Sequence, residues 1–220
     1  MDNVSPDERA KSARNAAIAR WSSKLGCEYC PLNEVPEIRK IKGTVEGKDI
    51  FVWAQSPGLD ENREKRELVG RSGQFLWGEL KRVGITRERC DIQNVVRCVP
   101  ADRVESVWPP PKLKMRDPTK EEIRCCSLYT IQAIEKQKAK LHLVFGEIAQ
   151  KALLGTEYKK DKKVFWSEKL NGNVVCLAHP SYFIRKGYGG DKSRKPNAQL
   201  LEFRERLDGH SRLSHVGDDR

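Results

Sequence analysis

Short apolar stretches alternate with amphipathic ones along most of the chain. Apolar runs of strand length occupy residues 49–54, 91–98, 140–145 and 173–178. Apolar residues at helical spacing predict helices over residues 73–83, 121–136, 146–154 and 197–207. Because strands that alternate with helices form parallel sheets covered on both faces, we expect an α/β fold. The predicted architecture is a three-layer α/β/α sandwich with a central, mainly parallel four-stranded sheet.

Three segments lie outside this alternation. Residues 1–24 contain the capping signal Ser-Pro-Asp-Glu at positions 5–8, which is followed by Ala-rich, basic sequence. They predict a basic helix, which either packs on the body of the protein or lies along DNA. Residues 104–120 contain consecutive prolines and several lysines, and they predict a basic, partly extended loop. We expect the folded domain to span residues 25–208, followed by a disordered tail over residues 209–220.

Composition restricts the class of protein. Hydrophobic residues make up 38% and charged residues 33% of the chain, which is polar but still allows a folded core. No apolar run approaches the ~20 residues of a membrane span, and the N-terminus lacks a signal-peptide pattern, so we expect a soluble cytoplasmic protein. The net charge of +11 indicates a polyanionic partner, with nucleic acid as the leading candidate and a generically basic protein as the alternative.

Seven cysteines in a chain without an export signal argue against a disulfide framework and favour metal ligands together with buried thiols. The Cys27-x-x-Cys30 spacing allows two thiolates to meet one metal centre, with Cys98 and Cys125 as candidate partners. Cys126, which is adjacent to Cys125, leaves the fourth ligand ambiguous. At this point a zinc ion, an iron–sulfur cluster and a coincidence of spacing are all open alternatives.

Further short motifs follow the cysteine pair. Together with the pair Cys27-x-x-Cys30, the motifs in chain order are Ala54-Gln55-Ser56-Pro57-Gly58, VGRSGQFL at 69–76, Asn94-Val95-Val96-Arg97-Cys98 and His179-Pro180-Ser181. Their order resembles the uracil-DNA glycosylase superfamily, specifically its iron–sulfur family 4, over about residues 25–207. The resemblance implies a [4Fe-4S] cluster on Cys27, Cys30, Cys98 and Cys125. It also implies an enzyme that acts on duplex or single-stranded DNA, and we expect a monomer.

A glycosylase turns the target nucleotide out of the stack, encloses its base and breaks the N-glycosidic bond. By resemblance, Asn94 reads the pyrimidine edge, and His179 donates to the base O2 and stabilises the leaving anion. The structural alternatives are a cap of the sheet edge for Asn94 and an ordinary buried role for His179. A carboxylate must also orient water or face the sugar cation. Glu61 is the first choice and Asp60 the second, unless both belong to a solvated acidic turn.

The expected base pocket departs from the family pattern in two places. The family's Gly-Glu-Gly-Pro-Gly is replaced by Ala-Gln-Ser-Pro-Gly, so Gln55 removes a carboxylate. Leu68 stands where the family has the phenylalanine that stacks on uracil, so a flat face is lost. Ser56 and Gly58 complete the expected base-binding set, together with Asn94. We expect the pocket to accept uracil or an enlarged, C5-substituted pyrimidine.

The segment after the histidine motif is where the family inserts a wedge into the duplex. Tyr182 and Phe183 are candidate wedge residues, with core aromatics as the alternative. Other residues expected to contact DNA are Ser181, Arg185, Arg71, Ser72, Lys112, Lys114, Lys160, Lys163, Lys186, Lys192, Arg194 and Lys195.

The sequence thus predicts a monofunctional DNA glycosylase that removes a pyrimidine base by hydrolysis and leaves an abasic site. Two versions compete: a DNA-repair enzyme that removes uracil, and a phage-defence enzyme that acts on modified phage bases. A rival from another class is a non-catalytic DNA-binding module that retained the fold after losing the carboxylate at position 55. A zinc-dependent nucleic-acid binder is a weaker rival.

Overall fold

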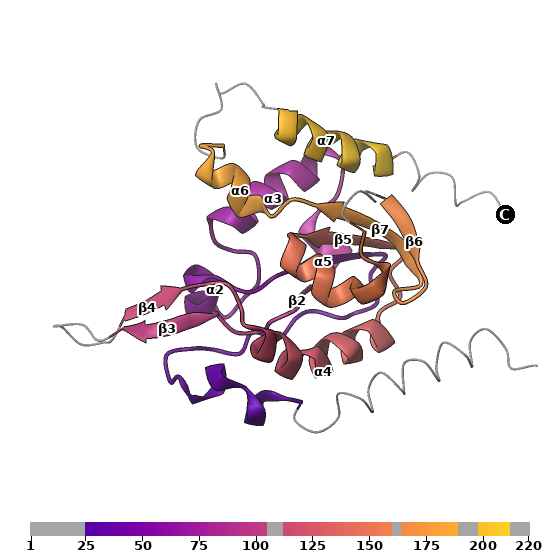
Figure 1. Cartoon of the computed structure of the whole chain (residues 1–220). Helices are drawn as coiled ribbons and strands as arrows, with labels where there is room; N and C mark the ends of the chain where they lie inside the picture. Colours follow the sequence, from indigo (N-terminus) through magenta and orange to yellow (C-terminus); the bar gives the residue numbers. More distant parts are fainter. Residues whose placement is uncertain (1–24, 105–111, 160–163, 189–197, 212–220) are drawn as a thin grey trace, which may run out of the picture.

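The computed structural model describes residues 25–104, 112–159, 164–188 and 198–211. Its centre is a five-stranded sheet in the order β2-β1-β5-β7-β6 (Figure 1). The strands are β1 (Ile50–Ala54), β2 (Cys90–Asn94), β5 (Leu141–Phe145), β6 (Val164–Ser167) and β7 (Gly172–Leu177). All neighbouring pairs are parallel except β6 and β7, which are antiparallel. The expected α/β fold with a mainly parallel central sheet is confirmed.

The fifth strand, β6, is the one that the hydrophobic pattern missed. Val164 and Trp166 are exposed, whereas Phe165 and Ser167 are buried. This alternation is typical of an antiparallel edge strand with one solvent-exposed face. Its apolar run, Val164-Phe165-Trp166, is only three residues long, which is too short to predict a strand by itself.

Helices cover both faces of the sheet. Alternate side chains of β1 point to opposite faces: Ile50 and Val52 join one core cluster, and Phe51 and Trp53 join the other. The helices on the first face are α3 (Arg71–Arg82), α6 (Pro180–Arg185) and α7 (Ala198–Ser211), and those on the second are α4 (Lys120–Lys136) and α5 (Glu147–Leu154). The three expected layers are therefore present, and both faces of β1 are buried.

A two-stranded antiparallel hairpin projects from the sheet domain (Figure 1). It consists of β3 (Ala101–Val104) and β4 (Lys112–Met115). The expectation of a loop over residues 104–120 is corrected here, because the flanks of the Pro-rich segment pair as strands. Where the hairpin returns to the domain, the backbone N–H of Arg116 donates to the carbonyl of Pro100 at 3.0 Å.

Other boundaries also differ from expectation. Two short helices, α2 (Leu59–Glu64) and α6, follow the ends of β1 and β7 and carry too few residues to show periodicity. The last helix, α7, continues to Ser211, so residues 209–211 are helical. The helix expected over residues 1–24 lies outside the described residues. Among the described helices, none is long and apolar enough to cross a membrane.

Candidate functional site

The carboxyl ends of the parallel strands bring three expected site residues to one edge of the sheet. Strands β1 and β2 end in register, so Asn94, the last residue of β2, pairs with Ala54, the residue before Gln55. Strands β5 and β7 also end together, because the N–H of Gly146 donates to the carbonyl of Leu177 at 2.9 Å. His179 follows immediately after this point. Ligand sites of parallel sheets gather at this edge.

His179 is held as a neutral hydrogen-bond donor. It caps α6, and its Nδ1 accepts the backbone N–H of Ser181 at 3.2 Å. The Ser181 Oγ lies 2.8 Å from the same nitrogen and accepts from Arg185 Nη1 at 2.9 Å. Because Nδ1 is an acceptor, the neutral ring carries its proton on Nε2. Burial, and then the positive charge of Arg185, lowers the pKa of His179 to about 4.

The imidazole of His179 packs against Gly146, the residue that leads into α5. A Cβ added at Gly146 would lie 3.2 Å from both Cβ and Cδ2 of His179. The φ of Gly146 is +87°, a value that residues with a side chain rarely adopt. The absence of a side chain at position 146 therefore sets where the imidazole can lie.

Asn94 presents an unpaired acceptor at the same edge. The residue is only 3% exposed, and its Oδ1 has no hydrogen-bond partner among the residues that the structure describes. A buried polar atom without a partner costs about 1–3 kcal/mol. A bound ligand that donates a hydrogen bond to this oxygen would remove the cost. This observation favours base reading by Asn94 over a cap of the sheet edge.

The two expected carboxylates are engaged by the protein itself. Glu61 is buried, and its Oε2 accepts the N–H of Gly58 at 3.0 Å. Its Oε1 accepts the N–H groups of residues 69 and 70 at 3.1 and 2.8 Å. Asp60 forms an ion pair with Arg63 at 2.8 Å. Glu61 therefore ties the turn before α2 to the loop before α3.

Leu68 has a strained backbone that the surrounding residues hold in place. Its φ of 51° lies in the left-handed region, which costs a residue with a side chain roughly 1–2 kcal/mol. Its carbonyl accepts from Trp77 Nε1 at 3.1 Å and from Arg87 Nη1 at 3.3 Å. A Cβ at Gly73 would lie 2.2 Å from the Leu68 carbonyl, so only glycine fits there. Strain of this kind gathers at ligand sites.

A carboxylate that sequence reasoning missed stands beside Gln55. Asp117 follows the hairpin, and its Oδ1 accepts from Gln55 Nε2 at 3.1 Å. Its charge also acts on His179, whose pKa it raises against the larger opposing effects of burial and Arg185. No motif or spacing could have identified Asp117, because it lies 62 residues from Gln55 in the sequence. Ser56, next to Gln55, is partly buried at the same edge.

The two candidate wedge aromatics differ in burial. Phe183 is fully buried, stacks on Phe75 at 5.5 Å and meets Phe203 edge-on at 5.0 Å. The expectation that Phe183 enters the duplex is therefore wrong, and the residue belongs to the core. Tyr182 is only partly buried beside it and remains the candidate wedge.

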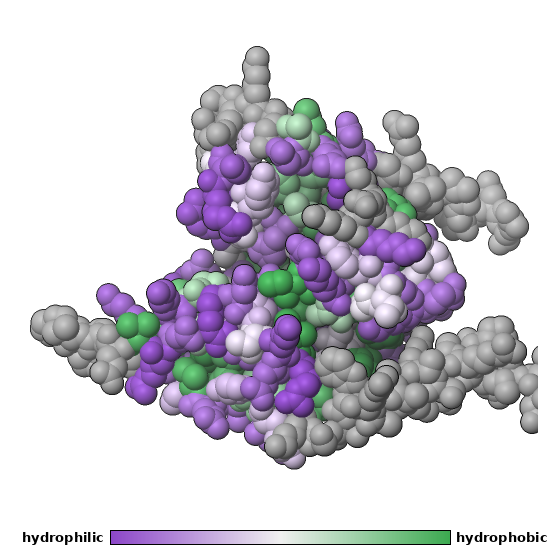
Figure 2. All heavy atoms as spheres, in the orientation of Figure 1, coloured by the Kyte–Doolittle hydropathy of each residue, from purple (hydrophilic) through white to green (hydrophobic). Residues whose placement is uncertain are grey.

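The other residues expected to contact DNA lie on several elements. Hydrophilic side chains gather over α6 and around β3 and β4 in the view of Figure 2. Exposed members of the expected set are Arg71, Lys112, Lys114, Arg185 and Lys186. Ser72 is partly buried on α3, and Ser181 is occupied by His179. Outside the described residues lie Lys160, Lys163, Lys192, Arg194 and Lys195.

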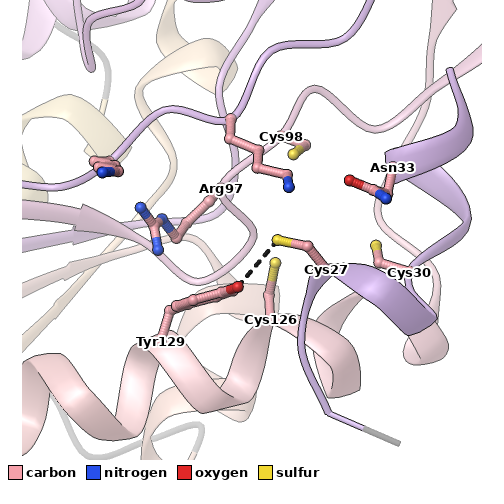
Figure 3. A pocket seen from close by; sticks show the side chains of 9 residues that line it. Cys27, Cys30, Asn33, Arg97, Cys98, Cys126 and Tyr129 are labelled. Carbon is pink, nitrogen blue, oxygen red and sulfur yellow. Dashed lines mark hydrogen bonds between the residues drawn. The ribbon is translucent and has the colours of Figure 1, made fainter. Parts of the chain in front are cut away.

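Four cysteines line a separate cavity of about 130 Å³ between the N-terminal segment, the end of β2 and α4 (Figure 3). They are Cys27, Cys30, Cys98 and Cys126. Cys125 is not among the lining residues, and its Sγ donates to a backbone carbonyl, that of residue 29, at 3.2 Å. Neighbours on a helix point about 100° apart, so Cys125 and Cys126 face different surroundings. Cys126 therefore lines the cavity, whereas Cys125, the ligand that the resemblance implied, is not among the lining residues, although its side chain hydrogen-bonds Cys30.

The four thiols that line the cavity are ligands of the kind that hold an iron–sulfur cluster or a zinc ion. Within the described ranges, no three His, Cys, Asp or Glu side chains are arranged to hold one metal ion. Burial raises the pKa of Cys30 and of Cys98 to about 12, so both thiolates need nearby positive charge. Lys40, Lys42 and Arg97 line the same cavity.

Comparisons with known proteins agree with this geometry. A type-4 uracil-DNA glycosylase of Pyrobaculum aerophilum is 30% identical over 170 residues, which cover 73% of this chain and 80% of that protein. Type-4 uracil-DNA glycosylases of Archaeoglobus fulgidus and Thermotoga maritima are 26% and 28% identical, over 71% and 72% of this chain and 77% and 78% of theirs. The family model described as the uracil DNA glycosylase superfamily matches residues 42–207. The chain therefore belongs to the uracil DNA glycosylase superfamily, which confirms the family and the class of enzyme expected from its motifs.

Proposed function

We propose that this protein is a monofunctional DNA glycosylase that removes a flipped pyrimidine base by hydrolysis and leaves an abasic site. The unpaired, buried Oδ1 of Asn94 carries the proposal, because it calls for a donor from outside the protein. Membership of the superfamily supports the class of reaction. The net charge of +11 supports DNA as the partner. We propose that the protein acts as a monomer.

Base recognition follows from the chemistry of the Asn94 amide. Its Oδ1 can accept N3–H of uracil while its NH₂ group donates to O4. A cytosine-type edge would present its amino group to the same Oδ1. Asn94 therefore selects a pyrimidine edge, and other residues must discriminate between the bases that carry one.

His179 stabilises the leaving base. When the bond from C1′ to the base breaks, negative charge develops on the base, and the Nε2–H of His179 is the donor that faces it. The pKa of His179, lowered to about 4, keeps this donor neutral at physiological pH. The charge of Arg185 acts through Ser181 on the opposite side of the ring, so it strengthens the donor without requiring its protonation.

One position favours a wider choice of base than uracil. Leu68 presents no flat aromatic face, and Gly58 presents no side chain at all. The family motif also has glycine at position 58, so only Leu68 is a departure from it. The missing aromatic face makes room at the pyrimidine ring, and we propose that uracil and C5-enlarged pyrimidines are substrates. The names of the relatives support uracil and hence a role in DNA repair. The departures at Gln55 and Leu68 support the alternative, defence against phages with modified bases.

The proposal assigns a [4Fe-4S] cluster to Cys27, Cys30, Cys98 and Cys126. When bound, such a cluster is held by the four cysteine thiolates, and its iron atoms join the N-terminal segment to the segment after β2 and to α4. Tyr129 would act on the site through Cys27, since its hydroxyl lies 3.1 Å from that Sγ. The positive charge around the cavity would balance the anionic cluster.

Base release from several duplexes, measured side by side, tests the proposed function. The duplexes carry uracil, only unmodified bases, 5-hydroxymethylcytosine, or the modified bases of a phage genome. We expect release from at least one of the non-standard duplexes. His179→Ala should slow it by roughly 10²-fold, the scale of losing one transition-state donor. DNA binding should change little, because phosphate contacts dominate affinity.

The same assay separates the alternatives. Leu68→Phe should shift the preference towards plain uracil, because it restores a stacking face. Efficient excision of uracil with rejection of every enlarged pyrimidine would contradict the wider substrate range. Intact DNA binding without release of any base would establish the non-catalytic DNA-binding module instead.

A further inference from the structure

We propose that Asp117 supplies the active-site carboxylate that this chain lacks at Gln55, and that it activates the attacking water. This inference rests on the proposed glycosylase function. Its first support is the hydrogen bond from Gln55 Nε2 to Asp117 Oδ1, at 3.1 Å. The family motif has a glutamate at the position of Gln55. The carboxylate is therefore not lost from this edge of the sheet but comes from another segment.

Asp117 is a better candidate than the two carboxylates of the motif. Glu61 has both oxygens bound to backbone N–H groups, and Asp60 is paired with Arg63. Asp117 is exposed, and among the described residues no group hydrogen-bonds its Oδ2. One oxygen is therefore oriented by Gln55, and the other is free to accept a proton from water.

The stem of the hairpin holds Asp117 in position. The guanidinium of Arg116, its chain neighbour, binds both oxygens of Glu122 at 2.9 and 2.6 Å. It also binds Asp102 on β3 at 2.8 Å and the backbone carbonyl of Asp117 at 3.1 Å. Glu122 is fully buried in the first turn of α4, where it also accepts the N–H of Thr119. The hairpin and α4 are thus locked together at the residue that precedes Asp117.

The hairpin also reaches the other side of the pocket. Cε of Met115, at the end of β4, lies 3.8 Å from the position of a Cβ at Gly58. Gly58 begins the turn that Glu61 ties to the loop of Leu68. The segment from Met115 to Asp117 therefore runs along the expected base site. Asp117 and Glu61 are the two carboxylates whose charges raise the pKa of His179 against the larger effects of burial and Arg185.

The proposed hydrolysis of the N-glycosidic bond consumes one water molecule and needs no other co-reactant. The water oxygen bonds to C1′ of the deoxyribose while the bond from C1′ to the base breaks and its electron pair moves to the base. The water proton passes to Asp117 Oδ2, and the base leaves as an anion stabilised by His179. The base then takes a proton from solvent, and Asp117 returns its own. A neutral Gln55 suits this arrangement, because a glutamate there would meet Asp117 at about 3 Å and one of the two would keep a proton.

Single-turnover base release by five proteins tests the proposal, using the duplex that wild type cleaves fastest. The proteins are wild type, Asp117→Asn, Asp117→Asn with Gln55→Glu, His179→Ala, and the control Glu121→Gln. Glu121 is exposed nearby on α4 and forms an ion pair with Arg124 at 3.4 Å. DNA affinity and thermal unfolding are measured for each, so that loss of chemistry is separated from loss of binding or folding.

We expect Asp117→Asn to slow release by roughly 10²-fold, within the usual range for a general base, with DNA affinity and unfolding close to those of Glu121→Gln. Adding Gln55→Glu should recover at least about tenfold, because it returns a carboxylate to the same site. Release by Asp117→Asn at the rate of Glu121→Gln would overturn the proposal, and so would a loss matched by an equal loss of DNA affinity. If wild type releases no base, the proposed function itself fails.

Discussion

Gly146→Ala tests how the backbone at the end of β5 positions the imidazole of His179. The new Cβ would lie 3.2 Å from Cβ and Cδ2 of that residue. Carbon atoms attract best at about 3.5–4.0 Å, so the ring must retreat by about half an ångström. A misplacement of about 1 Å can cost 10²-fold in rate, and we therefore expect base release to slow by about tenfold.

Gly155→Ala is a matched control at the other end of α5. Gly146 and Gly155 have positive φ angles, +87° and +57°, so alanine at either position strains the backbone by about 1–3 kcal/mol. A Cβ at Gly155, however, would meet no atom within 4 Å apart from its own helix and chain neighbours. Both variants should unfold at a lower temperature than wild type, but only Gly146→Ala should slow the chemical step.

Single-turnover base release at saturating enzyme, measured alongside thermal unfolding, distinguishes the two effects. The expected pattern is a similar loss of stability in both variants and a rate defect confined to Gly146→Ala. Equal rates for Gly146→Ala and Gly155→Ala would refute the reasoning, because they would show that the contact with His179 does not set its position.

Three further predictions concern the pH dependence of stability, the iron content of cysteine variants and the salt dependence of DNA affinity. Burial lowers the pKa of the fully buried His142 from 6.5 to about 4, and the pKa of His179 is lowered to about the same value. The two groups should therefore leave the free energy of unfolding unaffected above pH 6.5 and lower it by about 3 kcal/mol each between pH 6.5 and 4. Urea titrations across this range measure it, and an unchanged midpoint would contradict it. Cys126→Ser should lose iron from anaerobically prepared protein, and Cys125→Ser should retain it; the reverse result would restore Cys125 as the ligand. Lys112→Ala with Lys114→Ala should reduce the slope of log affinity against log salt by about 1.8, and an unchanged slope would remove β4 from the DNA contact.

Much of the scaffold could be read from the sequence because its strands are buried on both faces. A strand such as β1, with every residue buried, is a continuous apolar run and is recognised without knowledge of its neighbours. The edge strand β6 and the hairpin are different, since each becomes a strand only through pairing with a partner. Each of these strands has only four residues, too few for a pattern that would signal the pairing.

The positions of Gln55, Asn94 and His179 were also within reach of sequence reasoning. Each follows or ends a parallel strand, and the carboxyl ends of parallel strands necessarily meet at one edge. Motif order then pointed to the family, which the comparisons confirm. What each side chain does at that edge was a different matter, because it depends on hydrogen bonds between distant segments.

Tertiary contacts decided the rest. Cys125 and Cys126 are equivalent in composition and spacing, and only the packing of the N-terminal segment on α4 turns one towards the cavity and the other away from it. Glu61 matches an acidic motif, yet one of its oxygens accepts the N–H of Gly58 in that motif and the other accepts N–H groups of a loop that the motif does not contain. Asp117 matches no motif and reaches Gln55 only because the hairpin folds back onto the sheet edge. Sequence patterns record which residues a strand or helix must bury, whereas the partners of a polar side chain are fixed only when the elements pack together.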